Sequence, residues 1–155
     1  MSQPLFDAIR NEDVTTVIAL LDANPKLVDE KDHRGSTPLL LATYYGFEII
    51  TVTLLEHEQN VDAQDSAGNT ALMGVCFKGF ENIARLLIVN GANLNKTNSN
   101  GATALIFAAM FNRTSLIRLL LDNGADTSLK DDKGNTALDH ASMQGLKEVV
   151  AMLVN

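Results

Sequence analysis

The residues best suited to chemistry are three histidines and one cysteine, and their spacing argues against a catalytic or metal site. His33, His57 and His140 lie far apart, and none is three or four residues from another, as histidines on one helix face would be. Asp139 and His140 are adjacent, but neighbours on a helix point in different directions. Cys76 lies in an apolar run, where a free cysteine is usually a small buried side chain. We therefore expect no enzyme activity, no cofactor and no metal.

Charge and composition narrow the classes of partner. The chain of 155 residues has 19 acidic and 12 scattered basic residues, giving a net charge of −7. Nucleic-acid binding requires clustered lysine and arginine, so we expect none. No apolar run approaches the roughly 20 residues that span a bilayer, and the N-terminal residues do not resemble a signal peptide. With a single cysteine, these features predict a cytoplasmic protein without membrane contact.

A pattern that recurs every 33 residues organises the chain. Glycine recurs at this spacing, and each glycine is followed two residues later by threonine and four residues later by leucine. The repeated residues are Gly35, Gly68, Gly101 and Gly134; Thr37, Thr70, Thr103 and Thr136; and Leu39, Leu72, Leu105 and Leu138. A period of this length indicates stacked units, none of which buries its apolar face alone. The same regularity makes the glycines structural rather than part of a phosphate-binding loop.

Each of the four full units reads as a turn followed by two helices. Asp or Asn begins the turn and glycine occupies its fourth position. The threonine then stands where a helix N-cap belongs. An inner helix ends near Gly46, Gly79, Asn112 or Gly145, since asparagine tolerates left-handed geometry. An outer helix follows, and we expect Gly91 and Gly124 to close two of these helices.

Three places depart from this pattern. The first unit lacks the turn, as a terminal cap would, and Ser2 is suited to cap its first helix. The second unit has Glu58-Gln59 where later units have Gly-Ala, which predicts a strained or differently bent loop. In the last unit Asp139 replaces the apolar side chain of the other units, which suits a solvent-facing terminal repeat.

Together these residues resemble the ankyrin repeat, whose motif reads D-x-x-G-x-T-P-L-H-x-A-A-x-x-G before an outer helix ending L-L-x-x-G-A-D. The resemblance covers nearly the whole chain, although Leu40, Met73, Ile106 and Asp139 replace the motif's histidine. It implies an all-α ankyrin-repeat solenoid forming a single domain, residues 1–155, of about five repeats. The expected repeats are residues 1–30, 31–63, 64–96, 97–129 and 130–155, of which the first and last are caps.

The resemblance also implies a concave face made by the inner helices and hairpin tips, which in ankyrin proteins contacts partners. In such proteins the two residues that precede the glycine or asparagine at the end of each inner helix are variable, and so are the residues at the turn tips. We therefore predict a partner-binding set: Tyr44, Tyr45, Phe77, Lys78, Met110 and Phe111 on the inner helices, and His33, Arg34, Ser66, Asn69 and Asn100 at the tips. Aromatic and methionine side chains beside polar ones are typical of interface cores. The alternative is that the aromatic side chains seal the seams between repeats, and that Lys78 is a rim charge or only aids solubility.

The predicted function is non-enzymatic binding of a protein partner on the concave face, by a chain expected to be a monomer. Two alternatives stay open. The first is a structural role through self-association into a homo-oligomer. The second rests on the sequence motif Gly-Asn-Thr-Ala-Leu, which occurs at residues 68–72 and 134–138 and resembles small bacterial ankyrin proteins, some of which are encoded beside catalase. It is an accessory role in oxidative-stress defence.

Overall fold

The structure, a computed structural model, describes residues 3–154. Within that range the chain forms ten α-helices and one 3₁₀-helix, η1, and no strand. The elements are α1 (Gln3–Arg10), α2 (Val14–Ala23), η1 (Pro25–Asp29), α3 (Pro38–Tyr45), α4 (Glu48–Leu55), α5 (Ala71–Lys78), α6 (Glu81–Val89), α7 (Ala104–Met110), α8 (Thr114–Asp122), α9 (Ala137–Met143) and α10 (Lys147–Leu153). Ser2, expected to cap the first helix, lies outside the described residues.

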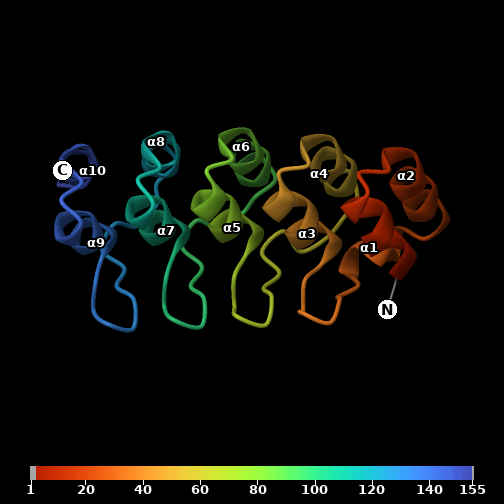
Figure 1. Cartoon of the computed structure of the whole chain (residues 1–155), viewed down its shortest axis with the longest axis horizontal. Helices are drawn as coiled ribbons and strands as arrows, with labels where there is room; N and C mark the ends of the chain where they lie inside the picture. Colours follow the sequence, from red (N-terminus) through yellow and green to blue (C-terminus); the bar gives the residue numbers. More distant parts are fainter. Residues whose placement is uncertain (1–2, 155) are drawn as a thin grey trace.

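The helices form pairs that stand side by side in one row (Figure 1). The odd-numbered helices α1 to α9 form an inner layer and the even-numbered helices α2 to α10 an outer layer (Figure 1). Each inner helix packs against the next inner helix and against the outer helix of its own pair. Hairpin loops project from the inner layer on the side away from the outer helices (Figure 1). The all-α solenoid expected from the 33-residue period is confirmed.

The threonines begin the inner helices and left-handed residues end them, as predicted. The hydroxyl of Thr70 accepts a hydrogen bond from the N–H of Met73 at 3.2 Å, and the other three threonines cap their helices in the same way. After α3 and α5 the chain turns at Gly46 and Gly79, with φ of 79° and 90°. Asn112, with φ of 58°, takes the same role after α7. These caps fix where the inner helices α3, α5 and α7 start and stop.

One continuous apolar core runs along the stack between the two layers. Leu39, Leu72 and Leu105 are each only 2% exposed, and they belong to a single cluster of buried side chains. Met73 and Ile106 are also buried, so apolar packing replaces the histidine of the motif at those positions. A unit removed from the stack would expose these side chains, which is why each repeat depends on its neighbours.

The loop after α4 is bent differently from those of later units, but it holds no left-handed residue. Gly91, which closes α6, has φ of 91°, whereas neither Glu58 nor Gln59 has positive φ. The amide of Gln59 instead donates hydrogen bonds to the carbonyl oxygens of Leu54, at 2.5 Å, and His57, at 3.1 Å. The expectation of a differently bent loop is confirmed. The strain expected from a side chain in left-handed geometry is wrong, because the glutamine satisfies the end of the helix without it.

Candidate functional site

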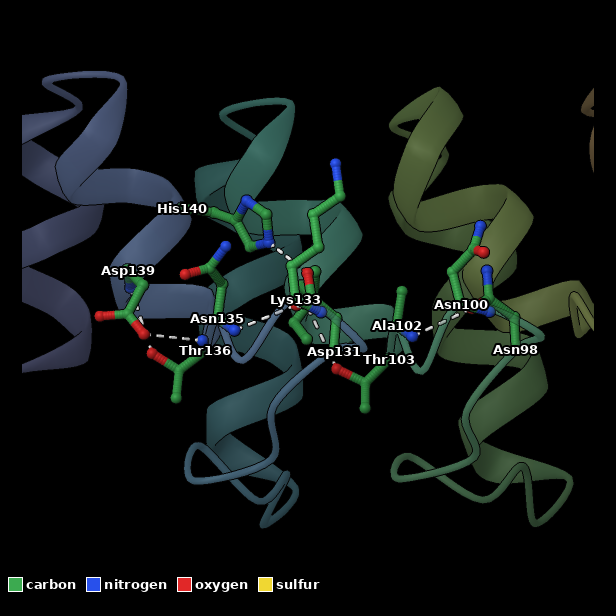
Figure 2. A network of polar contacts seen from close by, with 11 residues as sticks. Asn98, Asn100, Ala102, Thr103, Asp131, Lys133, Asn135, Thr136, Asp139 and His140 are labelled. Carbon is green, nitrogen blue, oxygen red and sulfur yellow. Dashed lines mark hydrogen bonds and ion pairs between the residues drawn. The ribbon is translucent and has the colours of Figure 1, made fainter.

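Each hairpin turn is built around the side chain of one aspartate or asparagine. Oδ1 of Asp65 accepts hydrogen bonds from the N–H groups of Ala67 and Asn69, both at 2.9 Å. Figure 2 shows the same arrangement around Asn98 and Asp131. The turn is therefore held by an acceptor oxygen that either residue type supplies.

The tips of successive turns are hydrogen-bonded to one another. Arg34 O accepts from Ser66 twice, from the backbone N–H at 3.3 Å and from the hydroxyl at 2.9 Å. The next two boundaries have the equivalent backbone bond at 3.0 and 2.9 Å. Asn69 Oδ1 also accepts from Asn98 Nδ2 at 2.9 Å. Two predicted partner-binding side chains, Ser66 and Asn69, are thus partly engaged in joining repeats.

The other three predicted tip residues present exposed side chains. These are His33, Arg34 and Asn100. Within residues 3–154 their side chains make no hydrogen bond or ion pair with another side chain, so they are available to a partner.

Four aromatic side chains of the predicted set are exposed on the inner helices or just after them. Tyr44 is 45% exposed, Tyr45 50%, Phe77 37% and Phe111 40%. The rings of Phe77 and Phe111 meet edge to face across a repeat boundary, with centroids 4.7 Å apart. The same rings therefore help to join repeats and still present apolar surface on the inner helices.

Lys78 and Met110, also predicted to bind a partner, are both engaged in contacts within the chain. The ammonium of Lys78 lies 4.8 Å from the ring centroid of Tyr44, a cation–π contact that links α5 to α3. Such contacts contribute about 0.5–1 kcal/mol at exposed sites. Met110 is half-buried and packs against the core, so only part of its side chain is available for binding.

A cavity of about 800 Å³ opens between the turn tips and the inner helices of the second and third units. Seven of the predicted residues line it: His33, Arg34, Tyr44, Tyr45, Ser66, Asn69 and Phe77. The remaining predicted residues, Lys78, Met110, Phe111 and Asn100, are not among its lining side chains. We call this cavity the groove. The exposed inner-helix side chains together with the turn tips are called the inner face.

A residue that sequence reasoning missed, Gly74, lines the groove. It occupies the position held by Leu41 in α3, Phe107 in α7 and His140 in α9. A Cβ built on Gly74 would have only Tyr44 Cδ1 nearby, at 3.6 Å, so the missing side chain leaves open space. Gly74 could have been found by aligning the units at their 33-residue period, because the equivalent residues Leu41, Phe107 and His140 all have larger side chains.

His140 forms the closest side-chain contact of the last unit (Figure 2). Its Nε2 lies 2.6 Å from Oδ2 of Asp131, and both side chains are mostly buried. Burial raises the pKa of Asp131, but the hydrogen bonds from His140, Asn135 N–H and Lys133 N–H outweigh it and hold that pKa below its usual range. The neighbouring Asp139 instead accepts from Thr136 N–H at 2.9 Å and is exposed. Sequence reasoning correctly separated Asp139 from His140 but missed the partner nine residues earlier.

The described residues hold no concentration of groups suited to metal or thiol chemistry. Within residues 3–154 no three His, Cys, Asp or Glu side chains are placed to hold a metal ion. Cys76 is fully buried, which raises the pKa of its thiol to about 12. In the same range, the helices are all too short or too polar to cross a membrane.

Comparison with known families is consistent with this geometry. A family model described as ankyrin repeats (3 copies) matches residues 5–98 and, in a second overlapping match, residues 72–155. Together the two matches cover almost the entire described chain. No curated protein matched the chain in a separate sequence search.

Proposed function

This chain belongs to the ankyrin-repeat family, and from that premise we propose that it is a non-enzymatic module that binds a protein partner on its inner face. Ankyrin repeats are generally protein–protein interaction modules. The partner is proposed to dock on the exposed aromatic side chains, while the turn tips select it. The free, buried Cys76 suits a reducing compartment, so we also propose a cytoplasmic location.

The observation that carries the proposal is the groove, with exposed aromatic rings beside polar turn tips. Tyr44, Tyr45 and Phe77 line it together with Arg34 and Ser66. Large aromatic side chains surrounded by polar residues are typical of the parts of interfaces that supply most binding energy. The rings are already held by contacts with one another, such as the stacking of Tyr45 on Phe47 at 5.6 Å. A surface ordered before binding loses less conformational entropy when a partner docks.

Substitution of two exposed rings tests the proposal. The double variant Tyr45→Ser and Phe111→Ser is expected to weaken capture of the native partner from a cell extract by the immobilised chain. Its thermal melt is expected to stay close to that of the parent, because both rings are about half exposed. Ile49→Ser is the matched control, since Ile49 is 69% exposed and lies on the outer helix α4 rather than on the inner face. A large fall in melting temperature with capture intact would instead identify the rings as seals between repeats.

Self-association is the second candidate, because the outer helix α4 also presents apolar side chains. Ile49 and Val52 are 69% and 45% exposed, which offers a second copy an apolar surface. Light scattering over a range of concentrations separates the two candidates: a constant monomer mass supports partner binding, and a mass that doubles with concentration supports self-association. The oxidative-stress role remains a prediction from the bacterial resemblance, and a peroxide-insensitive deletion strain would count against it.

A further inference from the structure

Three of the hairpin turns begin with aspartate, and two of these carboxylates also contact a basic side chain. Arg10 Nη2 lies 3.8 Å from Oδ2 of Asp32, and His140 Nε2 lies 2.6 Å from Oδ2 of Asp131. In both turns Oδ1 accepts two backbone N–H groups. Asp65 makes the same two turn bonds through Oδ1. No basic side chain in residues 3–154 contacts its Oδ2, so Asp65 alone of the three has that oxygen free.

In the last unit the basic side chain comes from the residue opposite the carboxylate on the inner helix, whereas Asp32 is reached by Arg10 from α1. In the last unit His140 rises from α9 and reaches Asp131 (Figure 2). In the third unit the equivalent residue is Gly74, which has no side chain. Asp65 and Gly74 both line the groove. The space that an imidazole fills in the last unit is therefore open in the third unit, and we call it the Asp65 slot.

One aromatic ring borders the Asp65 slot and a second lines the same cavity. Tyr44 and Phe77 line the same cavity, and Tyr44 Cδ1 is the nearest heavy atom to the space above Gly74. A carboxylate oxygen next to aromatic rings attracts a planar cation, because the carboxylate accepts its N–H groups and the rings attract its charge. The pair of His140 and Asp131 shows that this geometry accommodates a planar N–H donor.

We propose that the Asp65 slot receives an arginine side chain of the protein partner, whose guanidinium donates to Oδ2 of Asp65 against the rings of Tyr44 and Phe77. This inference rests on the proposed function, since it names the chemistry that the inner face recognises. Arginine fits better than lysine because its guanidinium is planar, stacks on aromatic rings and offers two parallel donors to a carboxylate. The slot thus takes from the partner the basic group that Arg10 and His140 supply to the other two turns.

One cation of this chain already contacts a ring of the slot: the ammonium of Lys78 lies 4.8 Å from the centroid of the Tyr44 ring, so an arginine competes with Lys78 for that ring. The other charges around the groove are compatible with this occupant. Arg10 is engaged by Asp7 at 3.4 Å and Asp32 at 3.8 Å, so its charge is balanced within the first two units. Arg34 and His33 lie on an exposed turn tip, where solvent and salt screen their charges. The whole chain carries a net charge of −7, which attracts basic segments over a longer range.

Titration with a capped tripeptide tests the slot directly. The probe is acetyl-Gly-Arg-Gly-amide, the control is acetyl-Gly-Gln-Gly-amide, and the readout is the backbone N–H spectrum of ¹⁵N-labelled chain. We expect saturable shifts at Ala67, Asn69 and Gly74 with the arginine probe alone, with a millimolar dissociation constant. Asp65→Asn is expected to weaken binding about tenfold, the loss of one charge-assisted hydrogen bond. The turn should survive, because Asn98 accepts the same two N–H groups in the fourth unit.

Two further variants keep the result unambiguous. Asp131→Asn removes the equivalent carboxylate outside the groove and is expected to leave the affinity for the arginine probe unchanged. Gly74→His is expected to close the slot, abolish binding of the probe, and give an introduced imidazole whose pKa is raised by Asp65. Equal binding of the glutamine probe, unchanged binding to the Asp65→Asn variant, or no saturable shift would each overturn the inference. Partner capture that still depends on Tyr45 and Phe111 would then show that the proposed function stands without the arginine.

Discussion

Adjacent turn tips lie so close together that a methyl group added at one of them should clash with the next turn. Comparing two glycine-to-alanine variants should separate the cost of this clash from the cost of left-handed strain. Gly68 and Gly134 occupy the same place in their units and both have φ of 82°. A Cβ on Gly68 would lie 2.7 Å from the backbone nitrogen of Ser99 in the next turn. A Cβ on Gly134 would have nothing within 4 Å, because among residues 3–154 no further turn follows this one. Gly68→Ala therefore combines left-handed strain with a backbone clash, and Gly134→Ala produces the strain alone.

The magnitudes follow from those two terms. Left-handed geometry costs a side-chain-bearing residue about 1–2 kcal/mol, which is the expected loss for Gly134→Ala. The clash at Gly68 involves backbone that is itself fixed by the bond from Ser99 N–H to Ala67 O at 3.0 Å. Overpacking of this kind adds about 1–3 kcal/mol. Gly68→Ala should thus destabilise the chain by about twice as much as Gly134→Ala.

Urea unfolding followed by circular dichroism measures both losses. In a chain of this length each kcal/mol corresponds to about 2–4 °C in melting temperature, so a thermal scan gives an independent check. Equal destabilisation of the two variants would refute the reasoning, because it would mean that adjacent turns are not held at the observed distance. A preserved hydrogen bond between Ser99 and Ala67 in the Gly68→Ala variant, detected by slow amide exchange, would refute it as well.

Three other predictions test single contacts. Hydrogen bonds from His140 and the turn N–H groups hold the pKa of Asp131 below its usual range, so its contribution to stability is complete above the unfolded pKa and is lost as the pH falls through the folded value. In the Asp131→Asn variant the urea midpoint should therefore fall less steeply with decreasing pH below about pH 4 than in the parent chain. An equally steep fall in both chains would contradict this. Asn112→Gly should stabilise the chain by about 0.5–1 kcal/mol and Asn112→Ala should destabilise it, because the position is left-handed; the reverse order in urea titrations would show that asparagine has another role there. Cys76, whose thiol pKa is raised to about 12 by burial, should react with iodoacetamide only after unfolding, and rapid labelling of the native chain would contradict its burial.

The parts of the fold that depend on backbone chemistry were predictable from sequence. Thr70 is an N-cap and Gly79 a left-handed cap because few other residues satisfy the ends of a helix in those geometries. Asn112 was predicted to replace glycine for the same reason, and its positive φ confirms it. These requirements are local, and they recur every 33 residues, so four imperfect copies reinforce one another.

The parts that depend on side chains meeting across repeats were not predictable. Lys78 was expected to be a rim charge or a solubilising residue, yet it lies over the ring of Tyr44 in the preceding unit. The loop at Glu58-Gln59 was expected to be strained or differently bent, but the way it bends was not foreseen: the amide of Gln59 caps the carbonyl groups at the end of α4. Both outcomes depend on side-chain rotamers in a packed neighbourhood, which no spacing rule specifies. The concave face was expected, but the opening at Gly74 was missed because it is formed by an absent side chain.

The central claim is that the inner face, rather than the outer helices, receives the partner. Hydroxyl-radical footprinting of the chain with and without its captured partner measures the solvent exposure of individual side chains. Binding is predicted to reduce oxidation of Tyr44, Tyr45 and Phe77, and to leave Ile49 and Val89, which are 69% and 84% exposed on the outer helices, unchanged. Protection of Ile49 and Val89 with the three aromatic rings still oxidised at the free rate would contradict the claim.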